Sequence, residues 1–324
     1  MGSRLAVGLD VGGTKIAGGL VDADGRIHER ARCETPADDR EALTEAIVSL
    51  ARDLCGQAGG DVLPVGVGAA GLVDLEGTVR YAPNLPWRDY PLARLISEAL
   101  DTPVTVENDA NAAAWGEYRA GAGTDASESM VMLTIGTGVG GGLVLDDRLV
   151  RGNGGLAAEF GHMVVNEGGP PCHCGNHGDL ESMASGTAIG RTAREAIAGG
   201  TLSAGSALAM MKAEIDGEDV TAAAQEGDAD AIAVLAKVGF WLGVGIGSLV
   251  NALDPQLVVI GGGGAGAGEL LLGPARQAAE ARVMGRAYRR LPAIVPAKLG
   301  NDAGMVGAGL LALEAADSTP DRDR

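Results

Sequence analysis

Residues 8–24 read GLDVGGTKIAGGLVDAD, and residues 131–147, 123 positions later, read VMLTIGTGVGGGLVLDD. Both stretches predict a strand, a glycine-rich turn, a second strand and a turn that contains aspartate. The two copies share a threonine, a Leu-Val pair and an aspartate as well as glycines. In the first copy the shared residues are Gly13, Thr14, Gly18, Gly19, Leu20, Val21 and Asp24. This internal repeat predicts two similar domains that face each other across a cleft.

Hydrophobic patterning outside the repeat adds helices between the strands, which predicts an α/β protein. The expected strands are residues 4–9, 16–21, 27–33, 62–69, 104–107, 130–135, 141–145 and 257–260. The expected helices are residues 39–55, 91–100, 108–119, 185–198, 202–214, 228–252, 268–283 and 303–315, followed by a polar, frayed tail at residues 317–324. Gly239, Gly243 and Gly247 give the longest helix a smooth face for close packing.

The composition argues against some classes of partner and indicates where in the cell the protein is located. The chain has 324 residues and is 46% hydrophobic, which is enough for about two domains with substantial cores. Its formal net charge of -18 argues against nucleic-acid and anionic-membrane partners. Four cysteines and no signal peptide predict a reducing, cytoplasmic location. The apolar run from Val238 to Leu253 is too short and too rich in glycine to be expected to span a bilayer.

A glycine-rich loop from Glu159 to Glu181, EFGHMVVNEGGPPCHCGNHGDLE, concentrates metal-ligand side chains. It holds three of the four histidines and two of the four cysteines. A loop this long with little apolar content needs something to hold it in place. A structural zinc ion bound by His162, Cys172, Cys174 and one further ligand would do so. The alternative is a flexible surface loop with chance cysteines.

The turn of the first repeat is a candidate phosphate site. Its residues nearly spell a Walker A loop, but lysine and threonine are exchanged, and a strand follows instead of a helix. We therefore expect a hairpin turn in which the amides of Gly12, Gly13 and Thr14, together with Lys15, hold phosphate oxygens. Asp10 beside the turn could hold a magnesium ion directly or through water. The alternative is a plain hairpin with a convenient pair of glycines.

Two further motifs are weaker on their own. Residues 136–141 and 261–266 match the dinucleotide pattern Gly-x-Gly-x-x-Gly, but a strand follows the first and four consecutive glycines inflate the second. Glu107-Asn108-Asp109 stands at the end of a strand and opens a helix, where α/β proteins bind ligands. Taken alone, Asn108 indicates a helix cap and Asp109 a first-turn acid.

Together these residues resemble the ROK family of sugar kinases, within the actin/hexokinase/Hsp70 ATPase superfamily. The resemblance covers nearly the whole chain. Its motifs are Asp10-Val-Gly-Gly-Thr-Lys15, Asn84-Leu-Pro, Glu107-Asn-Asp109, Gly136-Thr-Gly-Val-Gly-Gly-Gly142, Glu159-Phe-Gly-His162 and Cys172-His-Cys-Gly-Asn-His-Gly-Asp-Leu-Glu181. It implies a two-domain, actin-like ATPase fold (ribonuclease H-like) with a central cleft. The implied domains are residues 1–118 with 303–324, and residues 119–302 with the zinc loop and dimerisation helices.

The resemblance also implies the ATP-dependent phosphorylation of glucose at its C6 hydroxyl, by a homodimer or a dimer of dimers. Asp109 would accept the proton of that hydroxyl as its oxygen attacks the γ-phosphate, which fits the general logic of phosphoryl transfer. The other sugar-binding residues would be Gly71, Asn84, Asn108, Glu159, His162 and Glu181. The residues that meet ATP and Mg²⁺ would be Asp10, Gly12, Gly13, Thr14 and Lys15, with Thr137, Gly138 and Gly263 completing the nucleotide side.

The chain departs from the family pattern C-x-C-G-x-x-G-C-x-E at one position, where Asp179 replaces the third cysteine. A carboxylate oxygen can complete a tetrahedral zinc site, although it is a harder ligand than a thiolate. We therefore expect structural Zn²⁺ on His162, Cys172, Cys174 and Asp179. His173 or His177 could substitute if the loop rearranged. The metal would fix the loop that presents His162 and Glu181 to the sugar.

Other functions stay open on the sequence. A ROK kinase could act on fructose, mannose, allose or N-acetylmannosamine, because the hydroxyl-binding residues are shared. A non-catalytic ROK sugar-binding regulator would carry a helix-turn-helix before the first strand, where only nine residues precede Asp10. A nicotinamide-dependent dehydrogenase would leave the repeat and the Glu159–Glu181 loop unexplained. Polyphosphate as the phosphoryl donor would need a basic track, which an acidic chain does not suggest.

Overall fold

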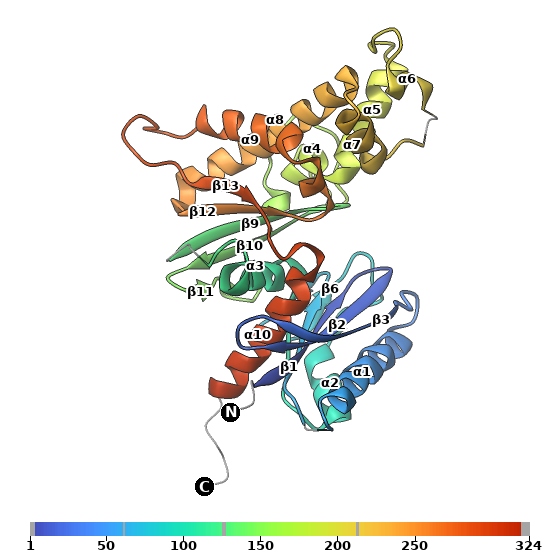
Figure 1. Ribbon diagram of the computed structural model, residues 1–324, viewed down its shortest axis with the longest axis vertical. Coiled ribbons are helices and arrows are strands. Elements are labelled where there is room, and N and C mark those ends of the chain that lie inside the picture. Colours follow the sequence, from blue (N-terminus) through green and yellow to red (C-terminus); the bar gives the residue numbers. More distant parts are fainter. Residues whose placement is uncertain (1–3, 61, 125–127, 212–213, 319–324) are drawn as a thin grey trace. The chain divides into compact units, whose positions relative to one another are not determined.

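The computed structural model describes residues 4–60, 62–124, 128–211 and 214–318 (Figure 1). The chain forms two compact units. Unit 1 comprises Met1–Ser127, Gly142–Ala158 and Lys298–Arg324, and unit 2 comprises Glu128–Gly141 and Glu159–Ala297. The C-terminal helix therefore belongs to the same unit as the N-terminal strands.

Unit 1 is built on a five-stranded sheet in the order β3-β2-β1-β4-β8. Its strands are β1 (Leu5–Val11), β2 (Lys15–Asp22), β3 (Ile27–Glu34), β4 (Val65–Ala69) and β8 (Val104–Asn108). The first three form an antiparallel meander, and β4 and β8 extend the sheet in parallel with β1. Parallel pairing aligns Asp10 with Gly68, and Gly68 with Glu107, so the motifs of β1 and β8 meet at the carboxyl edge of the sheet.

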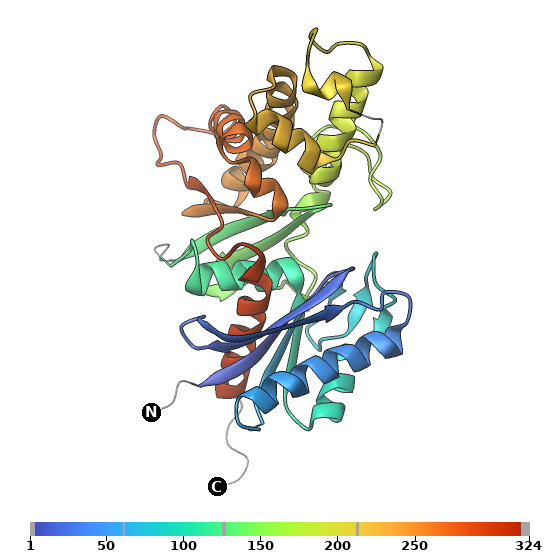
Figure 2. The ribbon, with the colours of Figure 1, turned by 45° about the vertical axis from the view of Figure 1, so that its right-hand side comes forward.

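Helices cover both faces of this sheet. α1 (Arg40–Gln57) and α2 (Leu92–Leu100) pack on one face and share its buried apolar cluster. α10 (Ala303–Ser318) packs on the other face beside α3 (Asp109–Ala120), as Figures 1 and 2 show. A Cβ on Gly8 of β1 would lie only 2.1 Å from the Met305 carbonyl oxygen. α10 therefore rests directly on the backbone of the sheet.

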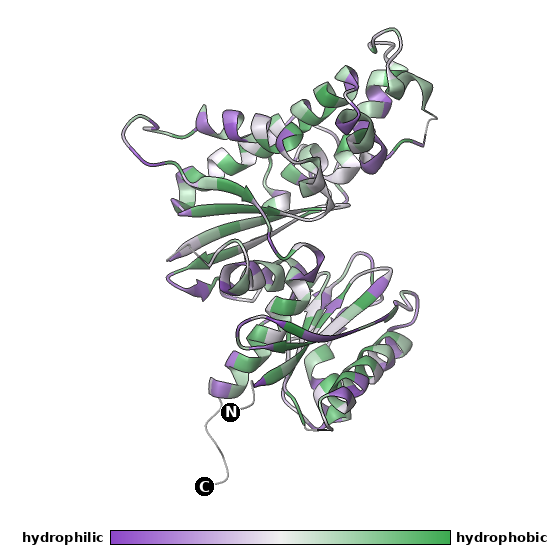
Figure 3. Ribbon diagram, in the orientation of Figure 1, coloured by the Kyte–Doolittle hydropathy of each residue, from purple (hydrophilic) through white to green (hydrophobic). Residues whose placement is uncertain are grey.

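A second sheet repeats this strand order as β11-β10-β9-β12-β13. Its strands are β9 (Ser129–Ile135), β10 (Val139–Leu145), β11 (Arg148–Leu149), β12 (Leu257–Gly261) and β13 (Ala293–Pro296). β12 runs parallel to β9 and to β13, just as β4 runs parallel to β1 and to β8. The equal strand order agrees with the internal repeat in the sequence. Figure 3 shows that the central strands of both sheets are predominantly hydrophobic.

The helices of unit 2 depart from the sequence prediction at several points. They are α4 (Leu180–Ala184), α5 (Gly186–Ala198), α6 (Ala207–Met210), α7 (Gly217–Gln225), α8 (Ala229–Leu253) and α9 (Glu269–Glu280), with the 3-10 helices η1 (Phe160–His162) and η2 (Gly263–Ala267). The helix expected at residues 202–214 is wrong, because only α6 is helical among its described residues. Gly205 has a φ of +89°, which interrupts a helix there.

α7 and β13 are among the elements that the sequence did not predict. α7 begins at a glycine, but Asp216 before it forms a capping box with Asp219 and so starts the helix. β13 is a four-residue strand at the sheet edge, too short to show a hydrophobic period. At the C-terminus α10 extends to Ser318, and the remainder of the frayed tail predicted at residues 317–324 lies outside the described residues.

α8 is the one helix in the described part of the chain that is long and apolar enough to cross a membrane by length and composition. It has 25 residues, because it begins at Ala229, before the apolar run of Val238–Leu253. Of its most apolar window, 56% is buried. A Cβ on Gly239 would lie 2.5 Å from Leu271 O, and one on Gly243 would lie 2.3 Å from Ala275 O. The glycine face therefore packs closely on α9, and α8 is built as a core helix.

Candidate active site

A hydrogen-bonded turn fixes Asp109 where β8 ends and α3 begins. Asn108 caps α3, because its Oδ1 accepts a hydrogen bond of 2.9 Å from the Asn111 N–H. Its Nδ2 donates to Gly71 O at 3.0 Å and to Asp109 Oδ1 at 3.1 Å. The Ala110 N–H donates to the same Asp109 oxygen at 2.9 Å. Asn108 therefore both caps the helix and orients Asp109.

Burial governs the charge of two carboxylates in this part of unit 1. It raises the pKa of Asp109 to about 6, against a smaller opposite effect of the hydrogen bonds from Ala110 and Asn108. It also raises the pKa of Asp10 to about 7, where the nearby Asp109 adds to the rise and Lys15 opposes it. A carboxyl pKa near 6 suits a general base at neutral pH. Two interacting acids also favour a bound cation, and oxygen ligands of this kind suit Mg²⁺.

The β1–β2 turn presents backbone donors to solvent. The Thr35 hydroxyl donates to Gly12 O at 2.8 Å, and the Thr35 N–H donates to Thr14 O at 3.1 Å, which fixes the turn. The Gly12 N–H is used within the hairpin, since it donates to Lys15 O. Gly13, Thr14 and Lys15 are exposed, and within the described ranges the amides of Gly13 and Thr14 meet no backbone acceptor. These two amides and the Lys15 ammonium are available to an anion.

Asn84 lies in a loop of a small sheet formed by β5 (Leu72–Val73), β6 (Val79–Tyr81) and β7 (Arg88–Tyr90). Arg88, for which the sequence gave us no signal, fixes this loop. Its Nη1 lies 2.6 Å from Trp87 O and 3.1 Å from Leu85 O, and its guanidinium stacks over the Tyr81 ring. A Cβ on Gly13 would lie 3.7 Å from Asn84 Cβ. The loop therefore holds the exposed Asn84 next to the β1–β2 turn.

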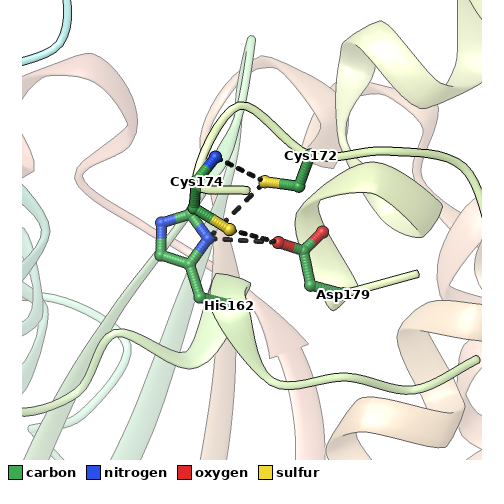
Figure 4. Close-up of side chains that lie close together, drawn as sticks. All are labelled: His162, Cys172, Cys174 and Asp179. Carbon is green, nitrogen blue, oxygen red and sulfur yellow. Dashed lines mark hydrogen bonds and ion pairs between the residues drawn. The ribbon is translucent and has the colours of Figure 1, made fainter. Parts of the chain in front are cut away.

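Four side chains of unit 2 converge where the sequence predicts a metal centre. One ligand atom from each of His162, Cys172, Cys174 and Asp179 lies within 4.8 Å of the other three (Figure 4). His162 Nδ1 is 3.2 Å from Asp179 Oδ2 and 3.8 Å from Cys172 Sγ. Cys174 Sγ is 3.4 Å from Asp179 Oδ2. Tetrahedral zinc with such ligands needs separations of roughly 3.3 to 3.8 Å, so the donor set fits this ion.

Asp179 has two functions in this cluster. Its Oδ1 accepts a hydrogen bond of 2.9 Å from the Ser182 N–H and caps α4, whereas its Oδ2 faces His162. Burial raises the pKa of Asp179, but hydrogen bonds from Cys172, the Ser182 amide and His162 outweigh burial and lower this pKa to about 2. Burial and the hydrogen bond with Asp179 raise the pKa of the Cys172 thiol. A bound zinc ion favours the thiolate and so opposes this shift.

The two ring nitrogens of His162 face different partners. Nδ1 faces the cysteine cluster, and Nε2 lies 4.0 Å from Glu159 Oε2. Glu181 is held from two sides, because its Oε2 accepts a 3.0 Å hydrogen bond from the Val139 N–H and its Oε1 lies 3.7 Å from Cys172 Sγ. The predicted sugar-binding residues of unit 2 are thus tied to the predicted metal ligands.

A cavity of 520 Å³ lies within unit 2, between the β9–β10 turn, α5, α7 and η2. Its lining residues are Gly136, Thr137, Gly186, Thr187, Ile189, Gly190, Arg194, Asp216, Gly217, Glu218, Thr221, Ala222, Gln225, Gly263, Gly264 and Gly266. Thr137 and Gly263, which were predicted for the nucleotide side, are among them. Gly138 is placed against Glu181 instead, where a Cβ would come within 2.2 Å of Glu181 Oε2.

The sequence model of the ROK family matches residues 6–315. The chain belongs to the ROK family. Among its ROK relatives, the glucokinase of Streptomyces coelicolor is 38% identical over 314 residues, which cover 96% of this chain and 98% of the relative. The glucokinase of Halalkalibacterium halodurans is 40% identical over 320 residues, which cover 96% of each chain. The ROK glucokinase of Streptomyces griseus, solved in complex with glucose and AMPPNP, has a TM-score of 0.84 at 40% identity, over 96% of this chain and 99% of that chain.

These comparisons confirm the ROK family and the two-domain, actin-like α/β fold that the motifs predicted. They also agree with the predicted enzyme class, a hexose kinase. ROK proteins of other kinds match at lower identity, such as an N-acetylmannosamine kinase at 34% and a xylose repressor at 28%.

Proposed function

We propose that this ROK protein transfers the γ-phosphoryl group of ATP to the C6 hydroxyl of glucose. The observation that carries the proposal is Asp109, a carboxylate that Asn108 orients and whose pKa burial raises to about 6. Asp109 accepts the proton of the attacking hydroxyl, as a positioned carboxylate does in phosphoryl transfer. The relatives named glucokinase, at 38% and 40% identity over nearly the whole chain, support glucose as the acceptor.

Several groups are proposed to bind the remaining hydroxyls of the sugar. They are the side chains of Glu159, His162, Glu181, Asn84 and Asn108, together with the backbone of Gly71. Both hydrogens of the Asn108 amide are already used, for Gly71 O and Asp109 Oδ1. Asn108 therefore binds the sugar only by exchanging one of these bonds, and its main contribution is the orientation of Asp109.

Zinc has a structural role in this proposal. His162 Nδ1, Cys172 Sγ, Cys174 Sγ and Asp179 Oδ2 would hold the ion, because the separations of these ligand atoms suit a tetrahedral zinc site. A bound ion would link η1 to the loop that leads to Glu181. His162 Nε2 and the Glu181 carboxylate then keep fixed positions for the sugar hydroxyls.

The unit 2 cavity supports ATP over polyphosphate as the donor. Its charged lining residues are two acids, Asp216 and Glu218, and Arg194, whose Nη1 is engaged with Ile215 O at 2.5 Å. Acidic side chains disfavour a chain of phosphates, whereas an uncharged adenosine group suits a cavity of 520 Å³. The proposed site for the phosphates is Gly13, Thr14 and Lys15, with Mg²⁺ at Asp10.

A coupled assay on a panel of hexoses tests this function. The panel contains glucose, fructose, mannose, allose and N-acetylmannosamine, each with ATP and with polyphosphate. The highest kcat/KM should belong to glucose with ATP. A higher kcat/KM with another sugar would support kinase activity on a different substrate. No turnover with any pair of sugar and donor would contradict the proposed kinase activity.

The implied homodimer or dimer of dimers belongs to the same proposal, and light scattering of the purified protein tests it.

A further inference from the structure

A buried ion pair is hydrogen-bonded to the turn that carries Asp109. Glu107 of β8 is only 4% exposed, and its Oε2 accepts a hydrogen bond of 2.5 Å from Arg151 Nε. Its Oε1 accepts hydrogen bonds of 3.0 Å from the Asn108 N–H and from Asn111 Nδ2. Glu107 and Arg151 both belong to unit 1, although 44 positions separate them in the sequence. One carboxylate thus joins Arg151 to two asparagines.

Of the two asparagines that Glu107 holds, Asn108 orients Asp109, and Asn111 holds Asn108. Asn108 donates its side-chain amide to Asp109 Oδ1, and the Asn111 N–H donates to Asn108 Oδ1. A continuous path of hydrogen bonds therefore runs from Arg151 through Glu107 and Asn108 to Asp109. Neither Arg151 nor Glu107 needs to touch a substrate to influence the position of Asp109.

Arg151 is required because a buried carboxylate needs a partner. If Arg151 were absent, Glu107 Oε2 would have no donor among the residues that the structure describes. An unpaired and desolvated carboxylate is strongly disfavoured, so Glu107 would turn toward water. This change disturbs the hydrogen bonds that Oε1 accepts from Asn108 and Asn111. Asp109 would then lose the support that fixes its carboxylate.

We infer that Arg151 is a positioning residue of this kinase, which acts on Asp109 through Glu107 and Asn108. The inference rests on the proposed role of Asp109 as the base. A small displacement of a reacting group costs a large factor in rate, so the effect should fall on kcat. The β1–β2 turn and the unit 2 cavity are formed by other residues, so the KM for ATP should not change.

Steady-state kinetics of Arg151→Met tests the inference. We expect a loss in kcat of about ten- to a hundred-fold, with the KM for ATP unchanged. Adding Glu107→Gln to this variant should restore most of the lost turnover. Glutamine keeps an oxygen for Asn108 and Asn111, but it leaves no unpaired charge behind. A merely structural role for Arg151 would not be relieved by removing a second native side chain.

Arg80→Met is the matched control. Arg80 Nε lies 2.7 Å from Oδ2 of the buried Asp74, so the control also removes the arginine from an ion pair with a buried carboxylate in the same unit. This variant should keep the wild-type kcat. If Arg151→Met does not fold, Arg151→Gln takes its place, with a smaller loss in kcat expected, because its amide can still donate to Glu107 without supplying a charge.

Three results would overturn the inference. These are wild-type kcat in the Arg151 variant, an equal loss in Arg80→Met, and no gain from adding Glu107→Gln. Asp109→Asn in the same assay separates this failure from that of the proposed function. If Asp109→Asn keeps turnover, Asp109 is not the base, and the positioning role of Arg151 is then also wrong. If Asp109→Asn loses turnover and the Arg151 variant does not, only Arg151 has been assigned wrongly.

Discussion

Asn108 donates its side-chain amide to Asp109 Oδ1 over 3.1 Å while its own Oδ1 caps α3. The residue that starts the helix therefore also orients the carboxylate at its first position. Asp109, the proposed base, is therefore positioned by an interaction that is common at the start of helices. What distinguishes this turn is the surrounding burial, which raises the pKa of Asp109 to about 6.

Asp109→Asn should abolish most turnover without unfolding the protein. The amide has the shape of the carboxylate, so the contacts with Asn108 and Ala110 can be kept, but it cannot accept the proton of the sugar hydroxyl. Loss of a general base costs about a hundred- to ten-thousand-fold in kcat. Calorimetric titration with glucose should show that binding persists. A variant with near-wild-type kcat would show that Asp109 is only a first-turn acid of α3.

The pH profile of kcat/KM should have an acid limb near pH 6. The base must be ionised to act, and burial raises the pKa of Asp109 to about 6 in the free protein. Activity should therefore fall as the pH drops below this value. A coupled assay from pH 5 to 8, with coupling enzymes in excess, measures the limb. A limb near pH 4, the ordinary range of an aspartate, would contradict the burial of Asp109.

The same shift predicts how stability depends on pH. The folded protein binds the Asp109 proton more tightly than the unfolded chain does, because its pKa rises from 3.8 to about 6. This contribution to stability is complete below about pH 4 and is lost as the pH rises through about 6. Asp179, with its pKa lowered to about 2, changes stability only below about pH 4. The Tm of Asp109→Asn minus that of wild type should therefore increase between pH 4 and 7.

Much of the fold could be predicted from the sequence because its signals are local. The repeated β-turn-β unit shows in identical residues, and Asn108 and Asp109 stand at a strand-to-helix junction that hydrophobic runs mark on both sides. Residues 202–214 contain an apolar run that predicts a helix, but the positive φ of Gly205 limits the described helix to α6. α7 was missed because its start depends on the hydrogen bonds of Asp216 rather than on apolar periodicity.

The predicted metal ligands also came from local features, since three of the four lie within eight residues. Two isolated β-bridges, Val164 with Asp179 and Pro171 with His177, fold the loop back so that His162 reaches the cysteines. Arg88 and Arg151 could not be recognised in this way. Arg88 binds backbone carbonyls, which any sequence offers, and Arg151 meets Glu107 only after distant parts of unit 1 have packed.

Arg88→Met should weaken glucose binding more than it slows chemistry. It removes the hydrogen bonds to the carbonyls of Ala82, Leu85 and Trp87 and so loosens the loop that carries Asn84. The loss of these bonds corresponds to a rise in the KM for glucose of about five- to thirtyfold. Arg52→Met is the control, since Arg52 donates to a single carbonyl, Ala99 O, in the same unit. Equal effects of the two substitutions would exclude a specific role for the Asn84 loop.

Zinc binding can be separated from helix capping at Asp179, because its two oxygens have different partners. We expect about one zinc ion per chain in protein purified without chelator, measured by elemental analysis. Asp179→Asn keeps an oxygen that can accept from the Ser182 N–H, but it presents an amide to His162 and the cysteines. It should lose zinc and raise the KM for glucose, because His162 and Glu181 lose their fixed positions. Asp179→Ala should lose the cap as well, at a further cost of about 1 kcal/mol in unfolding free energy.

Asp179→Cys should have the opposite effect on the metal. A third thiolate is a softer ligand than a carboxylate, so chelators should remove zinc more slowly than from the wild type while the kinase stays active. His173→Asn is the control for the alternative ligand, and it should leave the zinc content unchanged. Full zinc content in Asp179→Asn would show that Asp179 is only the cap of α4. Wild-type protein that is fully active without zinc would show that the four side chains hold the loop by hydrogen bonds alone. Asp179, in place of the family's third cysteine, would then have removed the metal site.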